Sequence, residues 1–414
     1  MFRLPVHTGG RKFSSSGFSR TYPFTALVGQ ERMRESLILA SVHPRLGGVL
    51  IRGERGTGKS TAVRALADLL PEIEVVTDCV YQCHPRQLGR MCDHCLARRQ
   101  KGETLPTSRR PVQVVELPLS ATEDRIVGGL DFEHALREGE RRIEPGVLAE
   151  ANRGVVYVDE VNLLDERLTH LLLDVLATGV NRIEREGVSF SHPAEFFLVG
   201  TMNPEEGELG PQLLDRFGLC VEVEGLSDLQ ERLEIVRRWG KFEEDPSSFG
   251  REWGLLQERL RRGIQEAQGL LRATDVPPEL LEAIVEICLA HDVAGHRADI
   301  LMREAARAIA ACQGRVEVTS EDVARAADFV LPHRSRRDPT LQNSPSLPQR
   351  NNGQRKDEQE QPGEAQAQAP SASPGSLEDD GEKEEAEGEG AGSAVNPAAA
   401  EGSRPAPPQA HTQG

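Results

Sequence analysis

The sequence predicts an α/β fold, in which helices flank a mostly parallel sheet and a smaller all-helical part follows. Between Tyr22 and Leu226, short apolar runs alternate with amphipathic stretches, and three of these runs end in glycine, acidic or amide residues. Strands that are buried on both faces of a parallel sheet have such continuous apolar runs. From about Ser227 to His333, apolar residues recur at three-to-four spacing, which is typical of helices.

These patterns also give the approximate bounds of the elements. The buried strands are expected at Gly47–Gly53, Gly154–Glu160 and Ala194–Pro204. The helices are expected at Ser60–Leu70, Leu255–Leu271, Pro278–Ala290, Arg297–Gln313 and Ser320–Leu331. Thr319 or Ser320 is an expected N-cap of the last helix, because acidic residues follow it in the first turn.

Composition predicts four segments along the chain. They are a flexible arm at 1–20, the α/β domain at 21–226, a helical domain at 227–337 and a disordered tail at 338–414. The tail consists largely of Gln, Pro, Ala, Glu, Gly and Ser. Such a segment cannot bury enough apolar surface to offset the entropy lost on ordering.

The charge balance limits the classes of partner. The chain has a formal net charge of −17, and only 4% of its residues are aromatic. Sequence-independent binding of nucleic acid needs a basic groove and stacking rings, so we expect no nucleic-acid partner. No run approaches the roughly 20 apolar residues of a membrane span, so we also expect no membrane association.

Cysteine content and the first residues bear on location. Seven cysteines in a large chain without a secretory signal favour reduced thiols and a cytoplasmic location over a disulfide framework. The first 20 residues are basic and serine-rich, with no acid before Glu31. They fit either a short organelle-targeting segment or a plain disordered arm, and the lack of a clear amphipathic period favours the arm.

The strongest motif matches G-x-x-x-x-G-K-[ST] and lies between a predicted strand and a predicted helix. Its backbone N–H groups and the positive end of the helix would surround phosphate oxygens. Lys59 would reach the β- and γ-phosphates of ATP, and the Ser60 hydroxyl would bind Mg²⁺. The expected nucleotide-binding residues are Gly53, Glu54, Arg55, Gly56, Thr57, Gly58, Lys59, Ser60 and Thr61.

Two further strand ends carry residues suited to ATP hydrolysis. Asp159 can hold the Mg²⁺ shell, and Glu160 can polarise the attacking water as a base or positioning group. Asn203 could donate a hydrogen bond to the γ-phosphate or to that water. Exposed acids at a strand end and a turn asparagine before proline are both common, so these assignments depend on the complete phosphate loop.

Two arginines lie apart from these strand ends. Arg216, in the run Leu213–Phe217, could reach the γ-phosphate of a neighbouring subunit and stabilise charge during phosphoryl transfer. The alternative is a local Asp–Arg surface pair, which is common and contributes little. Arg297, in the run Gly295–Asp299, begins a predicted helix and could fold onto the phosphates from that side.

A cysteine insert at residues 79–95 has the spacing Cys79-x3-Cys83-x8-Cys92-x2-Cys95. Two close pairs that come together suit a tetrahedral thiolate site for structural Zn²⁺. An iron–sulfur cluster needs the same four thiolates and cannot be distinguished by spacing. Four unligated thiols in a loop are the third alternative.

The order of the motifs resembles that of the AAA+ ATPases and, more narrowly, the I subunit of magnesium chelatase. The resemblance covers about residues 22–337. It implies an AAA+ ATPase domain and a lid domain, and ATP hydrolysis in a ring, commonly of six subunits. It also implies a D-type AAA+ partner and a large porphyrin-binding subunit, with which the ring drives Mg²⁺ insertion into protoporphyrin IX. The similar stretches are Tyr22–Glu31, Gly47–Glu74, Val114–Asp131, Glu144–Leu164 and Asn203–Leu219.

By this resemblance, Arg216 would be the arginine finger given to a neighbour, and Arg297 would be a second sensor of the nucleotide. Three departures stand out: Gly210 replaces an arginine that the family usually has, and the chain has the cysteine insert and the acidic tail. The residues implied for the site within one chain are Lys59, Ser60, Asp159, Glu160 and Asn203.

Two other functions fit the same motifs. The chain could be the motor of a cobalt chelatase in cobalamin synthesis, because the large subunit, and not this chain, selects the metal. It could also be an AAA+ chaperone that remodels another protein complex, with the tail as a docking arm. The complete ATP site argues against a catalytically silent scaffold like the D subunit.

Overall fold

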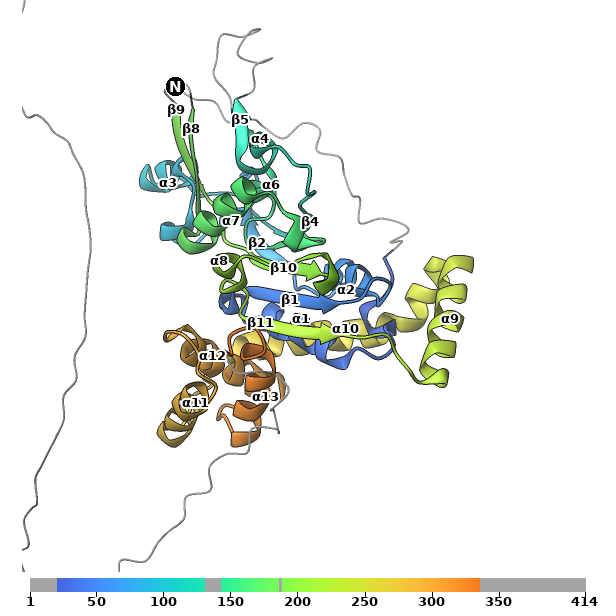
Figure 1. Ribbon diagram of the computed structural model, residues 1–414. Coiled ribbons are helices and arrows are strands. Elements are labelled where there is room, and N and C mark those ends of the chain that lie inside the picture. Colours follow the sequence, from blue (N-terminus) through green and yellow to red (C-terminus); the bar gives the residue numbers. More distant parts are fainter. Residues whose placement is uncertain (1–20, 131–142, 186–187, 336–414) are drawn as a thin grey trace, which may run out of the picture. The chain divides into compact units, whose positions relative to one another are not determined.

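The computed structural model describes residues 21–130, 143–185 and 188–335 (Figure 1). The predicted arm at 1–20 and the predicted tail at 338–414 lie outside these residues. Among the helices described, none has the length and apolar character needed to cross a membrane.

A five-stranded sheet forms the centre of the first part, in the order β11-β1-β10-β7-β4. Every neighbouring pair is parallel, as the apolar runs predict. The carboxyl ends of all five strands therefore meet at one edge. The strands are β1 (Gly48–Gly53), β4 (Val114–Glu116), β7 (Val155–Val158), β10 (Phe197–Met202) and β11 (Leu219–Val223).

Both faces of this sheet are covered. Val49 and Ile51 of β1 belong to one buried cluster, and Leu50 between them belongs to another. Helices α1 (Glu31–Val42) and α2 (Lys59–Leu66) contribute to the first cluster. The second includes side chains of α6 (Val147–Glu150) and α7 (Glu166–Thr178). Burial on both faces explains why the strands are apolar at consecutive positions.

Three antiparallel hairpins accompany the sheet, and the sequence patterns did not predict them. They are β2 (Ile73–Val76) with β3 (Thr107–Arg110), β5 (Gly128–Leu130) with β6 (Ile143–Pro145), and β8 (Val180–Arg185) with β9 (Val188–Pro193). Short α-helices are α3 (Asp93–Gln100), α4 (Glu123–Val127) and α8 (Pro211–Leu214). The 3-10 helices are η1 (Phe24–Ala26), η2 (Pro44–Leu46), η3 (Leu88–Arg90), η4 (Val161–Leu163) and η5 (Pro204–Glu206).

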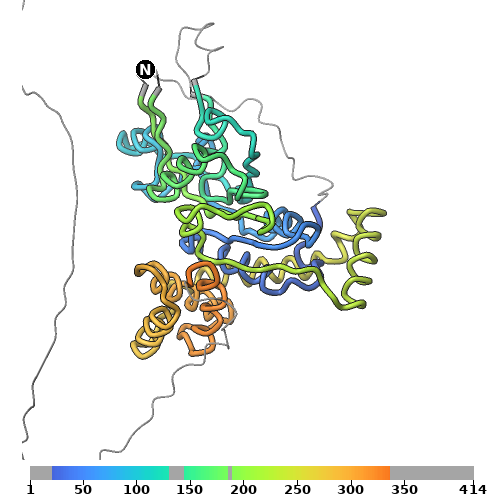
Figure 2. Tube along the Cα trace, in the orientation of Figure 1, coloured from blue at the N-terminus to red at the C-terminus, as the bar shows by residue number. Residues whose placement is uncertain are grey.

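The second part is helical, as predicted. In Figure 2, α10 (Pro246–Leu270, yellow) extends from α9 (Leu229–Glu244) toward α12 (Arg297–Cys312), and it also contacts α1. Helix α10 begins earlier than predicted because Asp245 caps it, accepting hydrogen bonds from the N–H groups of Ser247 and Ser248. The helices are α9 (Leu229–Glu244), α10 (Pro246–Leu270), α11 (Pro278–Ala290), α12 (Arg297–Cys312) and α13 (Ser320–Val330).

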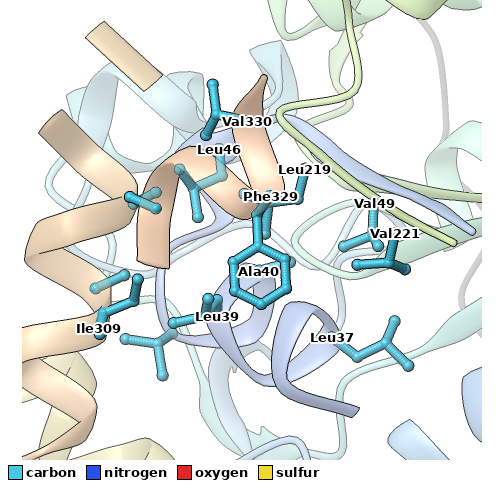
Figure 3. Close-up of a cluster of buried hydrophobic side chains, with 14 of the residues drawn as sticks. Leu37, Leu39, Ala40, Leu46, Val49, Leu219, Val221, Ile309, Phe329 and Val330 are labelled. Carbon is cyan, nitrogen blue, oxygen red and sulfur yellow. The ribbon is translucent and has the colours of Figure 1, made fainter. Parts of the chain in front are cut away.

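The last two helices share a hydrophobic core with the sheet. Figure 3 shows Phe329 of α13 near Ala40 of α1, with Leu219 and Val221 of β11 in the same cluster. Ile309 of α12 belongs to it as well. This packing brings the start of α12 close to the edge at which β1 and β11 begin. The boundary at residue 226 stays a prediction, because the buried cluster continues across it.

Candidate nucleotide-binding site

Three adjacent strands end around one cleft. Gly53 ends β1, Asn203 follows β10 and Asp159 follows β7, and these strands pair in the order β1-β10-β7. The cleft has a volume of about 290 Å³. Its lining residues are Arg55, Gly56, Thr57, Gly58, Lys59, Ser60, Thr61, Asp159, Glu160, Thr201, Met202 and Asn203. The fold thus brings together most of the residues that the sequence predicted for this site.

The phosphate loop owes its path to glycine at specific positions. A Cβ on Gly53 would stand 2.0 Å from the Val223 carbonyl oxygen, so only glycine lets β1 lie this close to β11. Gly58 precedes α2 with φ of 85°, a left-handed conformation that favours glycine. Apart from its chain neighbours, no described residue has an atom within 4 Å of the position that a Cβ would take. The loop therefore leaves open space at the N-terminal end of α2, which suits a phosphate group.

Lys59 lies across the mouth of this loop. Its ammonium donates hydrogen bonds to the carbonyl oxygens of Gly53 at 2.7 Å and Glu54 at 2.6 Å. Partial burial lowers the pKa of Lys59, and the nearby Asp159 and Glu160 carboxylates oppose that shift. The two hydrogen bonds hold the Lys59 ammonium beside the loop, where it can contact phosphate oxygens.

Asp159 is held by two hydroxyl groups. The Ser60 hydroxyl lies 3.3 Å from one carboxylate oxygen and 3.4 Å from the other, and the Thr201 hydroxyl donates to the same carboxylate. Burial raises the pKa of Asp159, but hydrogen bonds that include those from Thr201 and Ser60 outweigh it, so the net shift is downward. The ionised carboxylate and the hydroxyl of Ser60 are oxygen ligands of the kind that Mg²⁺ prefers, so the donor set fits this ion.

Two residues of the site had no role assigned to them from the sequence. Thr201 donates to Asp159 and also accepts a hydrogen bond from the Glu160 N–H at 3.2 Å. Glu206, on η5, forms an ion pair with Arg55 of the phosphate loop. The only available signal for Thr201 was a hydroxyl at the end of the third apolar run. No local pattern links Glu206 to a residue 151 positions earlier.

Glu160 has a strained backbone and a charged partner. Its φ is 55°, which is uncommon for a residue with a side chain. Its carboxylate lies 3.2 Å from the Arg55 guanidinium. Because the Arg55 side chain is 71% exposed, this ion pair contributes little to stability and can open at low cost. The Glu160 carboxylate therefore lies at the cleft and is not held there by a buried ion pair.

Asn203 is a buried residue that lines the cleft. Its side-chain oxygen accepts a hydrogen bond from the Glu205 N–H at 3.3 Å, which caps η5. The oxygen is therefore engaged by the backbone. Its amide nitrogen is the group that can donate to a phosphate or water oxygen.

Arg216 and Arg297 do not line this cleft. A Cβ on Gly47, just before β1, would stand 2.6 Å from the Arg216 carbonyl oxygen and 3.8 Å from the Arg297 guanidinium. Arg297 also forms an ion pair with Asp215 at 3.5 Å. Both arginines thus lie at the edge where β1 begins, whereas the phosphate loop follows its end. The six residue-to-residue steps from Gly47 to Gly53 span about 20 Å at strand geometry, which is far longer than an arginine side chain.

The four predicted metal-ligating cysteines also come together. They lie in the cysteine loop, which we define as residues 77–106 between β2 and β3. The sulfur atoms of Cys79, Cys83, Cys92 and Cys95 are all within 4.8 Å of one another, and the four side chains are buried. The Cys92 N–H donates to the Cys83 sulfur at 3.1 Å. All seven cysteines are free thiols.

A parallel sheet with a phosphate loop, an Asp–Glu pair at an adjacent strand end and a following helical part defines a P-loop ATPase of the AAA+ class. A family model described as "Magnesium chelatase, subunit ChlI" matches residues 23–212, and one described as "AAA lid domain" matches residues 281–358.

Individual proteins show the same similarity. The chain is 52% identical to the magnesium-chelatase subunit ChlI homolog of Methanocaldococcus jannaschii, over 77% of this chain and 86% of that protein. It is 49% identical to magnesium-chelatase subunit ChlI of Cyanophora paradoxa, over 77% and 92%. A putative ATPase of Cytophaga hutchinsonii shares the fold at 18% identity, with a TM-score of 0.51 over 75% of this chain and 84% of that one.

The chain belongs to the family of magnesium-chelatase subunit ChlI. It is therefore an ATP-hydrolysing AAA+ subunit that uses ATP and Mg²⁺. This confirms the resemblance seen in the sequence. The relatives do not favour a cobalt chelatase or an unrelated chaperone.

Proposed function

We propose that the chain is the motor that drives Mg²⁺ insertion into protoporphyrin IX, together with a D-type AAA+ subunit and a large porphyrin-binding subunit. The observation that carries this proposal is the assembled cleft, in which Lys59, Asp159 and Glu160 meet, in a chain of the ChlI family. We also propose a cytoplasmic location, which the lack of disulfides among the seven cysteines, all of them in the described residues, supports, because reducing compartments disfavour disulfides.

Each residue of the cleft has a proposed task in ATP hydrolysis. Mg²⁺ held by Ser60 and Asp159 would supply charge neutralisation to the phosphates. Lys59 binds the β- and γ-phosphate oxygens. Glu160 orients the attacking water and accepts its proton, and the Asn203 amide donates to the γ-phosphate or to that water. Positioning and charge stabilisation carry most of the catalysis in this class of reaction.

The positions of the two arginines support a ring assembly. Arg216 and Arg297 lie at the edge of the sheet opposite the phosphate loop, so neither can reach the nucleotide of its own chain in this arrangement. We propose that Arg216 acts as the arginine finger for a neighbour and that Arg297 senses the same neighbouring nucleotide. A head-to-tail interface repeats around a closed ring, and we expect six subunits.

A reconstitution experiment tests the proposed reaction. The chain is combined with a D-type subunit, a large chelatase subunit, protoporphyrin IX, ATP and Mg²⁺, and magnesium porphyrin is followed by its fluorescence. We expect product with the wild type and none with Glu160→Gln. Product formed only with Co²⁺ and a cobalt-chelatase large subunit would contradict the proposal.

We also propose that the cysteine cluster binds structural Zn²⁺. Four sulfurs about 2.3 Å from one tetrahedral ion lie about 3.8 Å apart, and the Cys79 and Cys92 sulfurs are 3.8 Å apart. An iron–sulfur cluster places an inorganic core between its thiolates, so some of its cysteine sulfurs must lie farther apart. The four sulfurs here all lie within 4.8 Å of one another.

Metal analysis of the purified chain tests this assignment. We expect one zinc per chain, its loss in Cys92→Ser, and its retention in Cys312→Ser, a control outside the cluster. Several irons per chain with visible absorption would favour an iron–sulfur cluster, and no metal would leave four free thiols.

A further inference from the structure

The cysteine loop has a small core of its own. Its buried cluster consists of four cysteines with only a few larger apolar side chains, among them Tyr81, Met91 and Leu105. A cluster of this size buries too little apolar surface to order about thirty residues, whereas a bound metal adds its binding free energy to folding. The loop should therefore depend on the metal for its order.

Hydrogen bonds from this loop reach the turn that leads into β7. The Asn152 side-chain amide donates to the Tyr81 carbonyl at 2.6 Å, and the Gln82 amide donates to the Glu150 carbonyl at 2.7 Å. The Arg153 guanidinium donates to the Gln82 carbonyl at 3.2 Å. All three contacts involve residues between Cys79 and Cys83, so the first cysteine pair sets their positions. Strand β7 then leads directly to Asp159.

The same segment contacts the β8–β9 hairpin. The Tyr81 ring stacks on His192 of β9, with centroids 4.5 Å apart and planes at 17°. His192 lies 2.9 Å from the amide of Asn181 on β8, and Asn181 donates to the Val127 carbonyl at 2.8 Å. Asn181 and His192 are buried, so these polar contacts lie on the inner face of the hairpin beside the apolar side chains of Ile183 and Phe190.

The backbone is strained where the cysteine loop meets the turn before β7. Gln82 has φ of 51° and Arg153 has φ of 62°, and the two residues are hydrogen-bonded to each other. A residue with a side chain is strained in the left-handed conformation, which persists only where its surroundings fix it. Two such residues in contact indicate that the cysteine loop holds the turn in this form.

We infer that the metal-loaded cysteine cluster anchors both the β8–β9 hairpin and the turn before β7, through Tyr81, Gln82 and Asn152. The inference rests on the proposed Zn²⁺ site and adds a structural role to it. Loss of the metal would release the hairpin and the residue 151–154 turn while the helical part of the chain stays folded.

Hydrogen–deuterium exchange with mass spectrometry tests this on the full chain, with the zinc content measured in each sample. Three samples are compared: the purified protein, the protein after a zinc chelator, and the same protein reloaded with Zn²⁺. We expect chelation to speed exchange at least tenfold in β8, β9 and residues 151–158, and reloading to restore protection. Helix α13 should remain protected throughout, as an internal control.

The outcomes separate the two proposals. Absence of zinc in the purified protein would overturn the metal site itself. Zinc that can be removed with faster exchange only within residues 77–106 would leave the site standing and overturn the anchor. Exchange that also rises in α13 would show general unfolding and overturn the anchor as well.

A variant that keeps all four thiolates gives an independent test. Tyr81→Leu should retain one zinc per chain but lose the stacking on His192, so β8 and β9 should exchange at least tenfold faster while α13 does not change. Unchanged exchange in the hairpin of this variant would contradict the inference.

Discussion

At the scale of single residues, the cleft depends on a cation and a carboxylate that different strands bring together. Lys59 is held by two carbonyl oxygens of its own loop, and Asp159 by hydroxyls from Ser60 and Thr201. Hydrogen bonds therefore fix both side chains at the cleft. Electrostatic groups that are positioned in advance are worth most in such sites.

Lys59→Ala should remove ATP hydrolysis, because the substitution takes away the cation proposed to contact the β- and γ-phosphates. Loss of one preorganised charge contact at a transition state costs roughly 100-fold or more in turnover. Steady-state phosphate release measures it, with Lys241→Ala on α9 as a matched control that should keep normal activity. Equal rates for the wild type and Lys59→Ala would refute the phosphate-loop assignment.

Thr201→Val should weaken the Mg²⁺ site without removing a ligand. The substitution removes the hydrogen bond that Thr201 donates to Asp159. It also removes the oxygen that accepts the hydrogen bond from the Glu160 N–H. Groups that orient a metal ligand are typically worth 10- to 100-fold in metal affinity, so we expect half-maximal ATPase activity at about tenfold higher Mg²⁺. Thr201→Ser keeps the hydroxyl and should titrate like the wild type, and an unchanged titration in Thr201→Val would argue against this role.

At the scale of elements, sequence patterns predicted the strands of the site but not the hairpins around it. Strands β1, β7 and β10 are apolar at consecutive positions, a strong local signal. The inner positions of β8 and β9 include Asn181 and His192, which are polar, so the alternation that identifies a half-buried strand is absent. The cysteine spacing predicted a cluster, but its contacts with β7 and β9 depend on residues far apart in the chain.

The predicted N-cap of α13, Thr319, is present, and its capping partner Asp322 is buried. The Asp322 carboxylate, 1% exposed, accepts hydrogen bonds from the Thr319 N–H at 2.8 Å and from Arg315. Asp322→Ala should lower the free energy of unfolding by about 2 kcal/mol, because it removes a cap and leaves Arg315 without its partner. Urea unfolding measures this, and Glu321→Ala, an exposed acid in the same turn, should have little effect.

The effect of Asp322 should depend on pH in a defined direction. Burial raises the pKa of Asp322, but hydrogen bonds from Arg315 and Thr319 prevail and lower it below its ordinary 3.8. A lowered pKa in the folded state stabilises the protein above the unfolded value, and that contribution is lost as the pH falls through the folded value. The stability gap between wild type and Asp322→Ala should therefore be constant near neutral pH and narrow below pH 3.8. A gap that widens on acidification would contradict this assignment.

At the scale of the whole molecule, the nucleotide cleft and the arginine pair occupy opposite edges of one sheet. The order of motifs along the sequence could not show this, because Arg297 follows the sheet by many residues and reaches it only through the packing of α12 and α13 against β1 and β11. A single chain therefore has a binding site and a separate pair of arginines. A ring of such chains would bring each pair to the next chain's cleft.

The most direct test of this arrangement mixes two inactive variants, Lys59→Ala and Arg216→Ala. Each should hydrolyse ATP poorly alone, and loss of an arginine finger costs about 10³–10⁵ in rate. In random mixed rings, roughly a quarter of the interfaces would pair an intact Lys59 with an intact Arg216 from the neighbour, so phosphate release should reappear. Failure to recover activity at any mixing ratio, with mixed assemblies shown to form, would contradict a site shared between subunits.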